Sequence, residues 1–342
     1  MKTYKHLWEQ FISKENFDLA AKKAIKSKKS KKEVHKFLAH REDYLIKLRH
    51  LLMSGKYKTS PYQTFTIHEP KERLIYKLPL YPDHILHHAL INILGPIWQK
   101  SFIHNSYACI PGRGLHAASQ KMMHFVRRNQ YVLQCDIRKF YPSINHSVIM
   151  NILTHKIHDK RILALLNEII WSVGGQTNLP IGNLTSQWLG NVYLNELDKF
   201  IKQDLHCRDY IRYCDDFCIF DNDKKNLHLI SKHIRDFLSQ NLKMTLSKSN
   251  VRRTVDGVCF IGYRHFKQFI LIKHFTAHKL KRRVIRILKN KDFNLKSIGQ
   301  LSAGYGWTKW CCSYNFRQSL RLFASSVSNK AQDFVKNYLF YT

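Results

Sequence analysis

The chain alternates short apolar runs of strand length with longer segments whose apolar positions recur three and four residues apart. Residues 131–136 (YVLQCD) predict a buried strand, and residues 210–220 (YIRYCDDFCIF) predict two short strands around an acidic pair. Further strands are expected at 257–263 and near 269–273. The helical spacing occurs over residues 84–98, 158–173, 184–203 and 226–240. A strand, two helices and a hairpin in this order indicate an α+β fold.

Two segments carry further local signals. The helix over 84–98 contains Gly95 and Pro96, where we expect it to end because proline interrupts the backbone hydrogen-bond ladder. Residues 1–60 contain a lysine run broken by apolar positions, which fits either a basic amphipathic helix or a solvated arm. The run forms an exposed face or contacts nucleic acid, and its members are Lys22, Lys23, Lys26, Lys28, Lys29, Lys31, Lys32 and Lys36.

Composition and charge narrow the class of protein. Of the 342 residues, 44% are hydrophobic, which is enough for a packed core and excludes a disordered or collagen-like chain. The 57 Lys and Arg residues outnumber the 24 Asp and Glu residues, giving a net charge of +33 that a polyanion would neutralise. Nucleic acid is therefore the expected partner class, ahead of an anionic membrane surface.

Membrane and disulfide chemistry are not expected. No window approaches the roughly 18 consecutive apolar residues of a spanning helix, and the first six residues lack the apolar core of a signal peptide. The eight cysteines include no C-x-x-C pair, which fits free thiols in a reducing, cytoplasmic compartment. A zinc site is conceivable but disfavoured because two of its four candidate ligands fall in predicted strands; these ligands are His206, Cys207, Cys214 and Cys218.

Three carboxylates interrupt apolar strands in this otherwise cationic chain. Asp136 ends the run at 131–135, and Asp215 and Asp216 separate the two strands of 210–220. Carboxylates in such settings lose hydration and must be protonated, paired with a cation or bound to metal. Ion pairing with nearby basic residues is the simpler reading. The alternative is that the three converge on a pair of Mg²⁺ ions, which prefer carboxylate oxygen and support nucleotidyl transfer.

Three motifs around these acids resemble the palm motifs A, B and C of reverse transcriptases, in order and spacing. They are 131–144 (YVLQCDIRKFYPSI), 179–187 (LPIGNLTSQ) and 210–217 (YIRYCDDF), the last containing a Y-x-D-D box. Arg73, the helix at 84–98 and the turn 106–114 are similar to the family's fingers motifs. Phe260, Ile261, Gly262 and Tyr263 are similar to its primer grip. The resemblance covers about residues 60–265.

The resemblance implies an α+β right-hand polymerase with an RRM/ferredoxin-like antiparallel palm sheet. We expect a basic helical N-terminal extension over 1–60, fingers over 61–130, a palm over 131–265 and a helical thumb over 266–342, with some fingers elements interleaved at about 150–178. The implied activity is RNA-directed DNA polymerisation, with template RNA, dNTPs and a cDNA/RNA duplex as partners.

The amino-acid sequence of motif B resembles that of one subclass, the enzymes of diversity-generating retroelements. An aliphatic Ile181 precedes Gly182, and Ser186-Gln187 ends the motif. That subclass makes adenine-mutagenised cDNA from a template-repeat RNA, with a small basic accessory protein and a structured RNA, and is bacterial or phage-encoded. A group II intron-like or defence-associated reverse transcriptase, and a catalytically idle RNA-binding protein on a palm scaffold, remain alternatives.

Metal-site roles follow from the matched motifs. Asp136 and Asp215 would hold two Mg²⁺ ions, for which Mn²⁺ can substitute, with Asp216 beside them and the Ile137 carbonyl as a further ligand. Lys248 is a candidate general acid for the pyrophosphate leaving group. An ordinary surface lysine is the simpler interpretation of Lys248.

Nucleotide-binding roles are carried over in the same way. Lys71 and Arg73 would clasp the triphosphate. Tyr141 would be a steric gate against the 2′-hydroxyl, unless it is a core aromatic. The remaining pocket residues are Ile181, Gly182 and Gln187. Because an aliphatic Ile181 offers contact area but no hydrogen bond to the base pair, we expect it to weaken discrimination between right and wrong pairs. In the C-terminal segment, Trp307 and Trp310 either stack along a duplex or belong to the thumb core.

Overall fold

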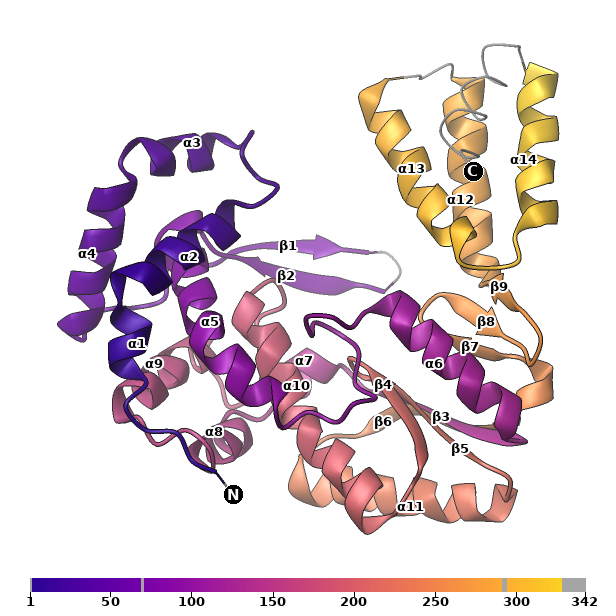
Figure 1. The fold of residues 1–342 in the computed structure, drawn as a ribbon, viewed down its shortest axis with the longest axis horizontal. Coiled ribbons are helices and arrows are strands. Elements are labelled where there is room, and N and C mark those ends of the chain that lie inside the picture. Colours follow the sequence, from indigo (N-terminus) through magenta and orange to yellow (C-terminus); the bar gives the residue numbers. More distant parts are fainter. Residues whose placement is uncertain (1, 69–70, 291–293, 328–342) are drawn as a thin grey trace.

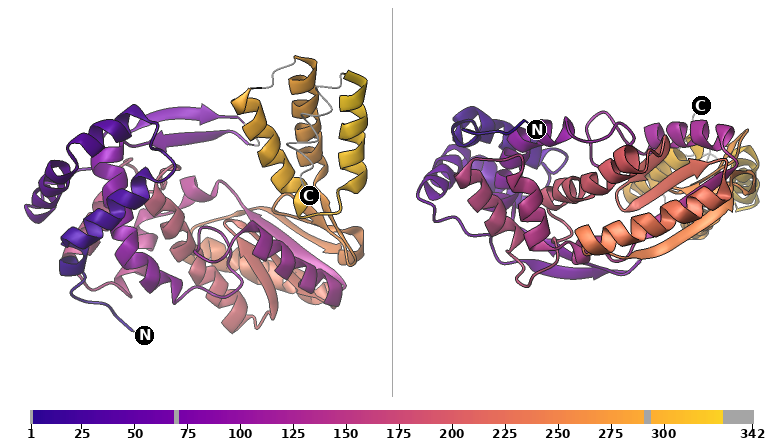
Figure 2. Two further views of the ribbon diagram at one scale, coloured as in Figure 1. Left: turned by 45° about the horizontal axis from the view of Figure 1, so that its top comes forward. Right: turned by 90° about the horizontal axis from the view of Figure 1, so that it is seen from below.

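The computed structural model describes residues 2–68, 71–290 and 294–327. N-terminal helices lie at one end, a mixed helical and sheet region forms the middle, and three C-terminal helices stand at the other end (Figure 1). The β1–β2 hairpin projects from the N-terminal helices toward the C-terminal ones (Figures 1 and 2). Within the described residues, no helix is long and apolar enough to cross a membrane.

The N-terminal helices share the main hydrophobic core. Their bounds are α1 (Trp8–Ile12), α2 (Lys14–Ile25), α3 (Lys32–Ala39) and α4 (Arg41–Met53). α2 packs against α5 (Ile85–Gln99), burying Phe17 and Ala20 completely, and Asn16 donates a hydrogen bond to the Ala89 carbonyl oxygen. The lysine run therefore belongs to packed helices and the turn between them, with its side chains directed outward, and is not a free arm.

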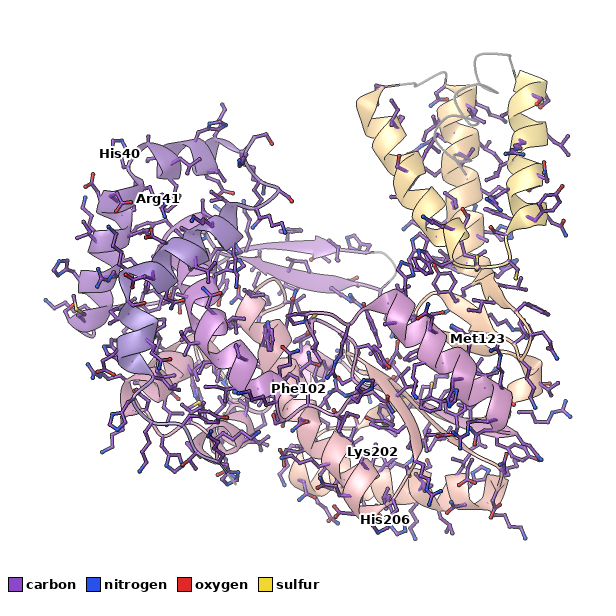
Figure 3. The ribbon with its side chains drawn as sticks, viewed as in Figure 1. His40, Arg41, Phe102, Met123, Lys202 and His206 are labelled. Carbon is purple, nitrogen blue, oxygen red and sulfur yellow. The ribbon has the colours of Figure 1, made fainter. Side chains whose placement is uncertain are left out.

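The central sheet contains four antiparallel strands in the order β4-β5-β3-β6. Their bounds are β3 (Tyr131–Ile137), β4 (Asp209–Tyr213), β5 (Asp216–Asp221) and β6 (Leu246–Arg253). Alternate residues face opposite sides, as the pleat of a strand requires. Leu133 packs toward α10 (Leu184–Lys199) and α11 (Lys224–Asn241), whereas Val132 packs toward α6 (Leu115–Arg128). The buried Met123 lies on α6 (Figure 3).

The remaining elements are short helices and two smaller sheets. The short helices and helical turns between residues 80 and 256 are η1 (Leu80–His84), α7 (Phe140–Ser143), α8 (His146–Thr154), α9 (Lys160–Ile170), η2 (Phe200–Asp204) and η3 (Thr254–Asp256). The two outer sheets comprise β1 (Gln63–Ile67), β2 (Arg73–Lys77), β7 (Val258–Phe260), β8 (Tyr263–His265) and β9 (Ile270–Ile272). The C-terminal helices α12 (His274–Lys289), α13 (Leu295–Lys309) and α14 (Tyr314–Val327) enclose a small core of their own.

Two predicted boundaries are wrong. α5 does not stop at Gly95 and Pro96 but continues to Gln99. Pro96 removes one hydrogen bond near the helix end, while the next turn buries Trp98, which is 1% exposed. A side chain at Gly95 would come within 3.2 Å of the Trp188 ring on α10. The expected strand over 257–263 is interrupted by a turn and forms β7 and β8.

Candidate active site

The register of the central sheet brings the three predicted carboxylates together. Asp136 on β3 is paired with Asp216 on β5, and the side chains of these two residues are hydrogen bonded. Asp215 lies in the turn between β4 and β5, which Cys214 enters with a left-handed φ of 55°. A strand end and an adjacent hairpin turn thus supply the three acids, as the apolar runs on either side of them predicted.

Crowding of these carboxylates changes their protonation. Loss of hydration, followed by the charges of Asp136 and Asp215, raises the pKa of Asp216 to about 7, although this side chain is exposed. Loss of hydration also raises the pKa of Asp215 against the lowering effect of a hydrogen bond from its own backbone, and the Asp136 charge adds to the rise. The cluster therefore favours either a bound proton or a bound cation.

The basic end of the β1–β2 hairpin faces this acidic cluster. Lys71 Nζ lies 3.4 Å from Asp136 Oδ2, although the lysine side chain is 70% exposed. The charges of Lys71 and Arg73 both lower the pKa of Asp215, against the larger raising effect of burial. The exposed side chains of Lys71 and Arg73, at the start of β2, thus lie near the carboxylates. They could bind the negative charge of a polyphosphate.

Strand β6 closes the other side of Asp136. The single Ser247 hydroxyl proton is shared between the Asp136 carboxylate and, at 3.1 Å, the Asp136 backbone oxygen. Lys248 is paired with Asp136 across the strands and its side chain is exposed. Sequence analysis did not identify Ser247, because a polar serine in a polar segment gives no signal of what it contacts.

A buried polar network lies directly beneath the acidic turn. Arg212 on β4 makes two hydrogen bonds to Asp198 on α10, of 2.8 and 2.6 Å, and both side chains are 0% exposed. Arg212 Nη1 also donates to the carbonyl oxygen of Cys214 at 3.0 Å and to Asn191 Oδ1 at 3.1 Å. The guanidinium group therefore holds the backbone immediately before Asp215. Sequence analysis missed this role, although a charge inside an apolar strand was a visible signal.

Tyr141 lies beside the acidic turn rather than deep in the core. It belongs to α7, is half-buried, and a Cβ on Gly190 of α10 would lie 3.3 Å from its ring. Burial raises the pKa of Tyr141, and the neighbouring charges of Cys214, Cys109 and Asp215 add to the rise. Its phenol therefore stays neutral next to the carboxylates.

The motif B loop is tied to the β1–β2 hairpin. The Tyr76 amide donates a 2.8 Å hydrogen bond to the Ile181 carbonyl oxygen. Gly182 has a φ of 130°, and a Cβ there would lie 2.2 Å from the Tyr76 carbonyl oxygen. Gly182 is thus required for close approach to β2, a packing reason that sequence analysis did not anticipate. Gln187 is exposed on the first turns of α10.

A polar groove of about 180 Å³ begins at Asp216 and runs to the β7–β8 turn. Its lining includes Lys248, Ile261, Gly262 and Lys273. The turn is left-handed at both positions, with φ 46° at Ile261 and 87° at Gly262. Left-handed backbone is costly for a β-branched residue, so neighbouring structure must hold this turn in place.

The expected primer-grip residues divide into two kinds. Ile261 and Gly262 border the groove, whereas the Phe260 and Tyr263 side chains are 5% and 0% exposed and face the core. Trp307 of α13 covers the turn so closely that a Cβ on Gly262 would lie 2.4 Å from its ring. Tyr263 donates a 3.2 Å hydrogen bond to the Trp307 carbonyl oxygen.

Trp310 differs from Trp307 in its surroundings. It is 43% exposed and stacks on the imidazole of His116 at 4.1 Å between ring centroids. Of the two tryptophans, Trp307 thus packs against the turn of the outer sheet, and Trp310 offers an open ring face. Of the four residues considered for a zinc site, Cys218 is buried in the sheet. Within the described residues, no group of three or more His, Cys, Asp or Glu side chains is arranged to hold a metal ion, and this includes Asp136, Asp215 and Asp216 as they lie.

The acidic cluster itself fits a hard divalent cation in the chemistry of its donors. Asp136, Asp215 and Asp216 supply only carboxylate oxygens, the ligands that Mg²⁺ prefers. The raised pKa values of Asp215 and Asp216 indicate that a nearby cation would stabilise their ionised forms. The Asp136 carboxylate is hydrogen bonded to Ser247 and Lys71. To bind a cation together with Asp215 and Asp216, this carboxylate must turn away from both partners.

Comparison with known proteins assigns the chain to a family. A family model described as reverse transcriptase (RNA-dependent DNA polymerase) matches residues 68–265. Protein YkfC of Escherichia coli strain K12 is 25% identical over 265 residues, covering 64% of this chain and 70% of that protein. The retron Ec73 reverse transcriptase of Escherichia coli is 26% identical over 229 residues, covering 59% of this chain and 70% of that protein.

A group II intron protein is also similar. The group II intron-encoded protein LtrA of Lactococcus lactis subsp. cremoris is 24% identical over 172 residues, which is 47% of this chain and 29% of that protein. The family match includes the acidic cluster, the motif B loop and the β7–β8 turn. The chain therefore belongs to the reverse transcriptase family and is an RNA-directed DNA polymerase.

Proposed function

We propose that Asp136, Asp215 and Asp216 form the catalytic centre and hold two Mg²⁺ ions, with the Ile137 carbonyl as an additional ligand. The observation that carries this proposal is the pairing of Asp136 with Asp216 beside Asp215, together with the raised pKa of Asp216. When bound, the two cations supply the charge that activates a primer 3′-hydroxyl and stabilises the leaving pyrophosphate. Mn²⁺ has similar oxygen affinity and can substitute.

The protein's own residues would then position the substrates. Arg73 and Lys71 take the negative charge of the dNTP triphosphate, and when phosphate attracts Lys71 it releases the Asp136 carboxylate for metal binding. Tyr141 blocks the space of a ribose 2′-hydroxyl. The groove between Asp216 and the Ile261–Gly262 turn holds the primer end, and Lys248 at its edge can give a proton to pyrophosphate.

The domain map follows from these roles. We assign residues 61–130 to the fingers, 131–265 to the palm with interleaved fingers elements at about 150–178, and 266–342 to the thumb, of which residues 291–293 and 328–342 lie outside the described residues. Residues 1–60 form a basic helical extension that packs on α5. The exposed ring of Trp310 and the basic face of α12 are suited to a template–primer duplex, whose phosphates they neutralise without sequence preference.

A primed RNA template tests the chemistry. The full chain should extend the primer with dNTPs and Mg²⁺, and the double variant Asp215→Asn plus Asp216→Asn should not. Asp236→Asn, which removes an exposed carboxylate on α11, is the matched control and should extend at the wild-type rate. Extension by the double variant would exclude these acids from catalysis.

We further propose that the enzyme serves a diversity-generating retroelement, making adenine-mutagenised cDNA from a template-repeat RNA with a small basic accessory protein. Support comes from Ile181 before Gly182 and from Ser186-Gln187 after it. The Ile181 carbonyl oxygen already accepts a hydrogen bond from the Tyr76 amide. Ile181 can therefore contact a base pair through its side chain. An aliphatic group contributes contact area without a hydrogen bond to report a mismatch.

Sequencing of cDNA distinguishes the subclass. Wild-type enzyme should misincorporate mainly opposite template adenine, and Ile181→Gln should lower that rate, whereas the size-matched Ile181→Leu should keep it. Uniformly accurate copying by the wild-type enzyme would favour the group II intron-like alternative, for which the similarity to LtrA speaks.

A further inference from the structure

Two cysteines from separate segments meet at the catalytic turn. Cys214 is the variable residue of the Y-x-D-D box, directly before Asp215, and Cys109 belongs to the loop 103–114 ahead of α6. Their thiols are neighbours, close enough for each to shift the pKa of the other. Cys109 is exposed, and Cys214 is half-buried. The polymerase mechanism proposed above makes no use of either sulfur.

Backbone hydrogen bonds fix these two segments side by side. Ser106 forms a parallel bridge with Arg212, flanked by bonds from the Tyr107 amide to the Arg212 oxygen at 3.1 Å and from the Arg212 amide to the Asn105 oxygen at 3.0 Å. Counting forward from this bridge, the two parallel segments reach Cys109 and Cys214 within three and two residues. The contact between the thiols therefore results from a defined register.

The buried polar network also ties the two segments to one point. Asn191 donates a 2.9 Å hydrogen bond to the Ala108 carbonyl oxygen, while Arg212 Nη1 binds both Asn191 Oδ1 and the Cys214 carbonyl oxygen. Cys109 and Cys214 both have left-handed backbone, with φ of 56° and 55°. The backbone at Ala108 and at Cys214 is thus tied to the same network, and both cysteines lie in turns.

Three of the other described cysteines lie in the core, while Cys259 and Cys312 are exposed. Cys135, Cys207 and Cys218 are buried, and burial raises the pKa of each thiol. By contrast, Cys109 is exposed, so that its thiol can meet a solute from solvent with the Cys214 sulfur beside it.

We propose that Cys109 and Cys214 are a reversible oxidation site, at which hydrogen peroxide links the two sulfurs and stops polymerisation. The Cys109 sulfur attacks the peroxide oxygen to give a sulfenic acid and one water, and Cys214 displaces the second water to form the disulfide. Two electrons pass from the sulfurs to the peroxide. A cellular dithiol reverses the step by exchange.

The disulfide would act on catalysis through the turn. Bonded sulfurs lie about 2.05 Å apart, much closer than two unbonded thiols, so the link pulls Cys214 toward the loop. Asp215 is the next residue, and its carboxylate must meet Asp136 and Asp216 for the cations to bind. This effect on activity rests on the proposed role of Asp215, whereas formation of the link does not.

Oxidation of the full chain tests both halves. After treatment with hydrogen peroxide, mass spectrometry of non-reduced digests should show a disulfide between the peptides containing residues 109 and 214. Extension of a primed RNA should fall about tenfold or more and return with dithiothreitol. Cys109→Ser should be active and resistant to peroxide, and Cys109→Ala repeats the test without a hydroxyl. Cys312→Ser, which removes another exposed thiol, should respond like the wild type.

The outcomes separate cleanly. Absence of the linked peptides overturns the oxidation site, whether or not the enzyme polymerises. Linked peptides with unchanged activity, or equal peroxide sensitivity in Cys109→Ser, overturn its control of catalysis. If reduced wild-type protein does not polymerise at all, the proposed function fails, and the linked peptides alone decide the oxidation site.

Discussion

The buried Arg212–Asp198 pair offers a test of how the acidic turn is held. We consider Arg212→Met, Asp198→Leu and the double variant. Asp198 accepts hydrogen bonds from Arg212 Nε at 2.8 Å, Arg212 Nη2 at 2.6 Å and the Tyr210 hydroxyl at 2.6 Å, and neither charged side chain is exposed. Each single substitution leaves one charge buried without its partner, whereas the double variant removes both charges.

The stability effects should therefore be non-additive. Removing one partner of a buried pair costs about 3–5 kcal/mol, while replacing both with apolar residues of similar volume is often close to neutral. Each single variant should lose about that much free energy of unfolding in urea, followed by circular dichroism, and the double variant much less. Glu196→Gln breaks a half-exposed pair with Lys199 on the same helix and should cost about 1 kcal/mol or less.

Activity should not recover with stability. The double variant still lacks the hydrogen bond from Arg212 to the Cys214 carbonyl oxygen, which is 3.0 Å in the wild type. A hydrogen bond from a charged group is worth about 1.5–3 kcal/mol, equivalent to about 10- to 100-fold in rate. Single-turnover primer extension should fall by that amount with little change in primer–template affinity. A double variant as unstable as the single variants, or one that polymerises at the wild-type rate, would refute the reasoning.

Three further changes test other parts of the site. In metal-free protein, Asp216→Asn should stabilise the fold more at pH 8 than at pH 5: the raised pKa of about 7 means that the folded state keeps a proton the unfolded chain has released, so stability falls as pH rises from about 4 to 7. Gly182→Ala, whose Cβ would lie 2.2 Å from the Tyr76 oxygen, should destabilise the motif B loop by about 1–3 kcal/mol and raise the KM for dNTP. Tyr141→Ala should raise incorporation of ribonucleotides relative to deoxyribonucleotides about tenfold or more in primer extension.

Each of these expectations has a clear opposite. Equal stability of Asp216→Asn and wild-type protein at both pH values would show that the pKa of Asp216 is not raised in the folded state. An unchanged KM for dNTP in Gly182→Ala would mean that the motif B loop does not contribute to nucleotide binding. An unchanged sugar ratio in Tyr141→Ala, with Tyr141→Phe as the control that keeps the ring, would return Tyr141 to a packing role.

Most of the predicted elements are ones whose side chains enter a core, although the predicted strand β9 is only half-buried. β3, β4 and β5 were recognised because their apolar runs are nearly continuous, and α9, α10 and α11 because their apolar positions follow the helical period. The missed strands β1, β2 and β6 are largely exposed; β2 and β6 show no regular alternation, and in β1 the alternation of threonine with Phe65 and Ile67 spans only four residues. Helix α6 was also missed, although Ala118, Met122 and Phe125 follow helical spacing and are buried.

The candidate site divides in the same way. Asp136, Asp215 and Asp216 stood out because a carboxylate in an apolar strand needs a reason, and the sheet register then brings them together. The contacts of Ser247 depend on which strand pairs with β3, and those of Arg212 on which helix packs against β4. Such partners are distant in sequence and are set by tertiary packing, so local patterns do not specify them.

Cleavage by bound iron tests the central claim most directly. Fe²⁺ that replaces Mg²⁺ at the acidic cluster and reacts with ascorbate and peroxide cuts the nearby backbone. We predict cuts close to residue 136 and close to residues 215–216 in the same molecules, both suppressed by excess Mg²⁺ and both absent from Asp215→Asn plus Asp216→Asn. Cuts at neither segment, or at one without the other, would contradict a shared cation site built from β3 and the β4–β5 turn.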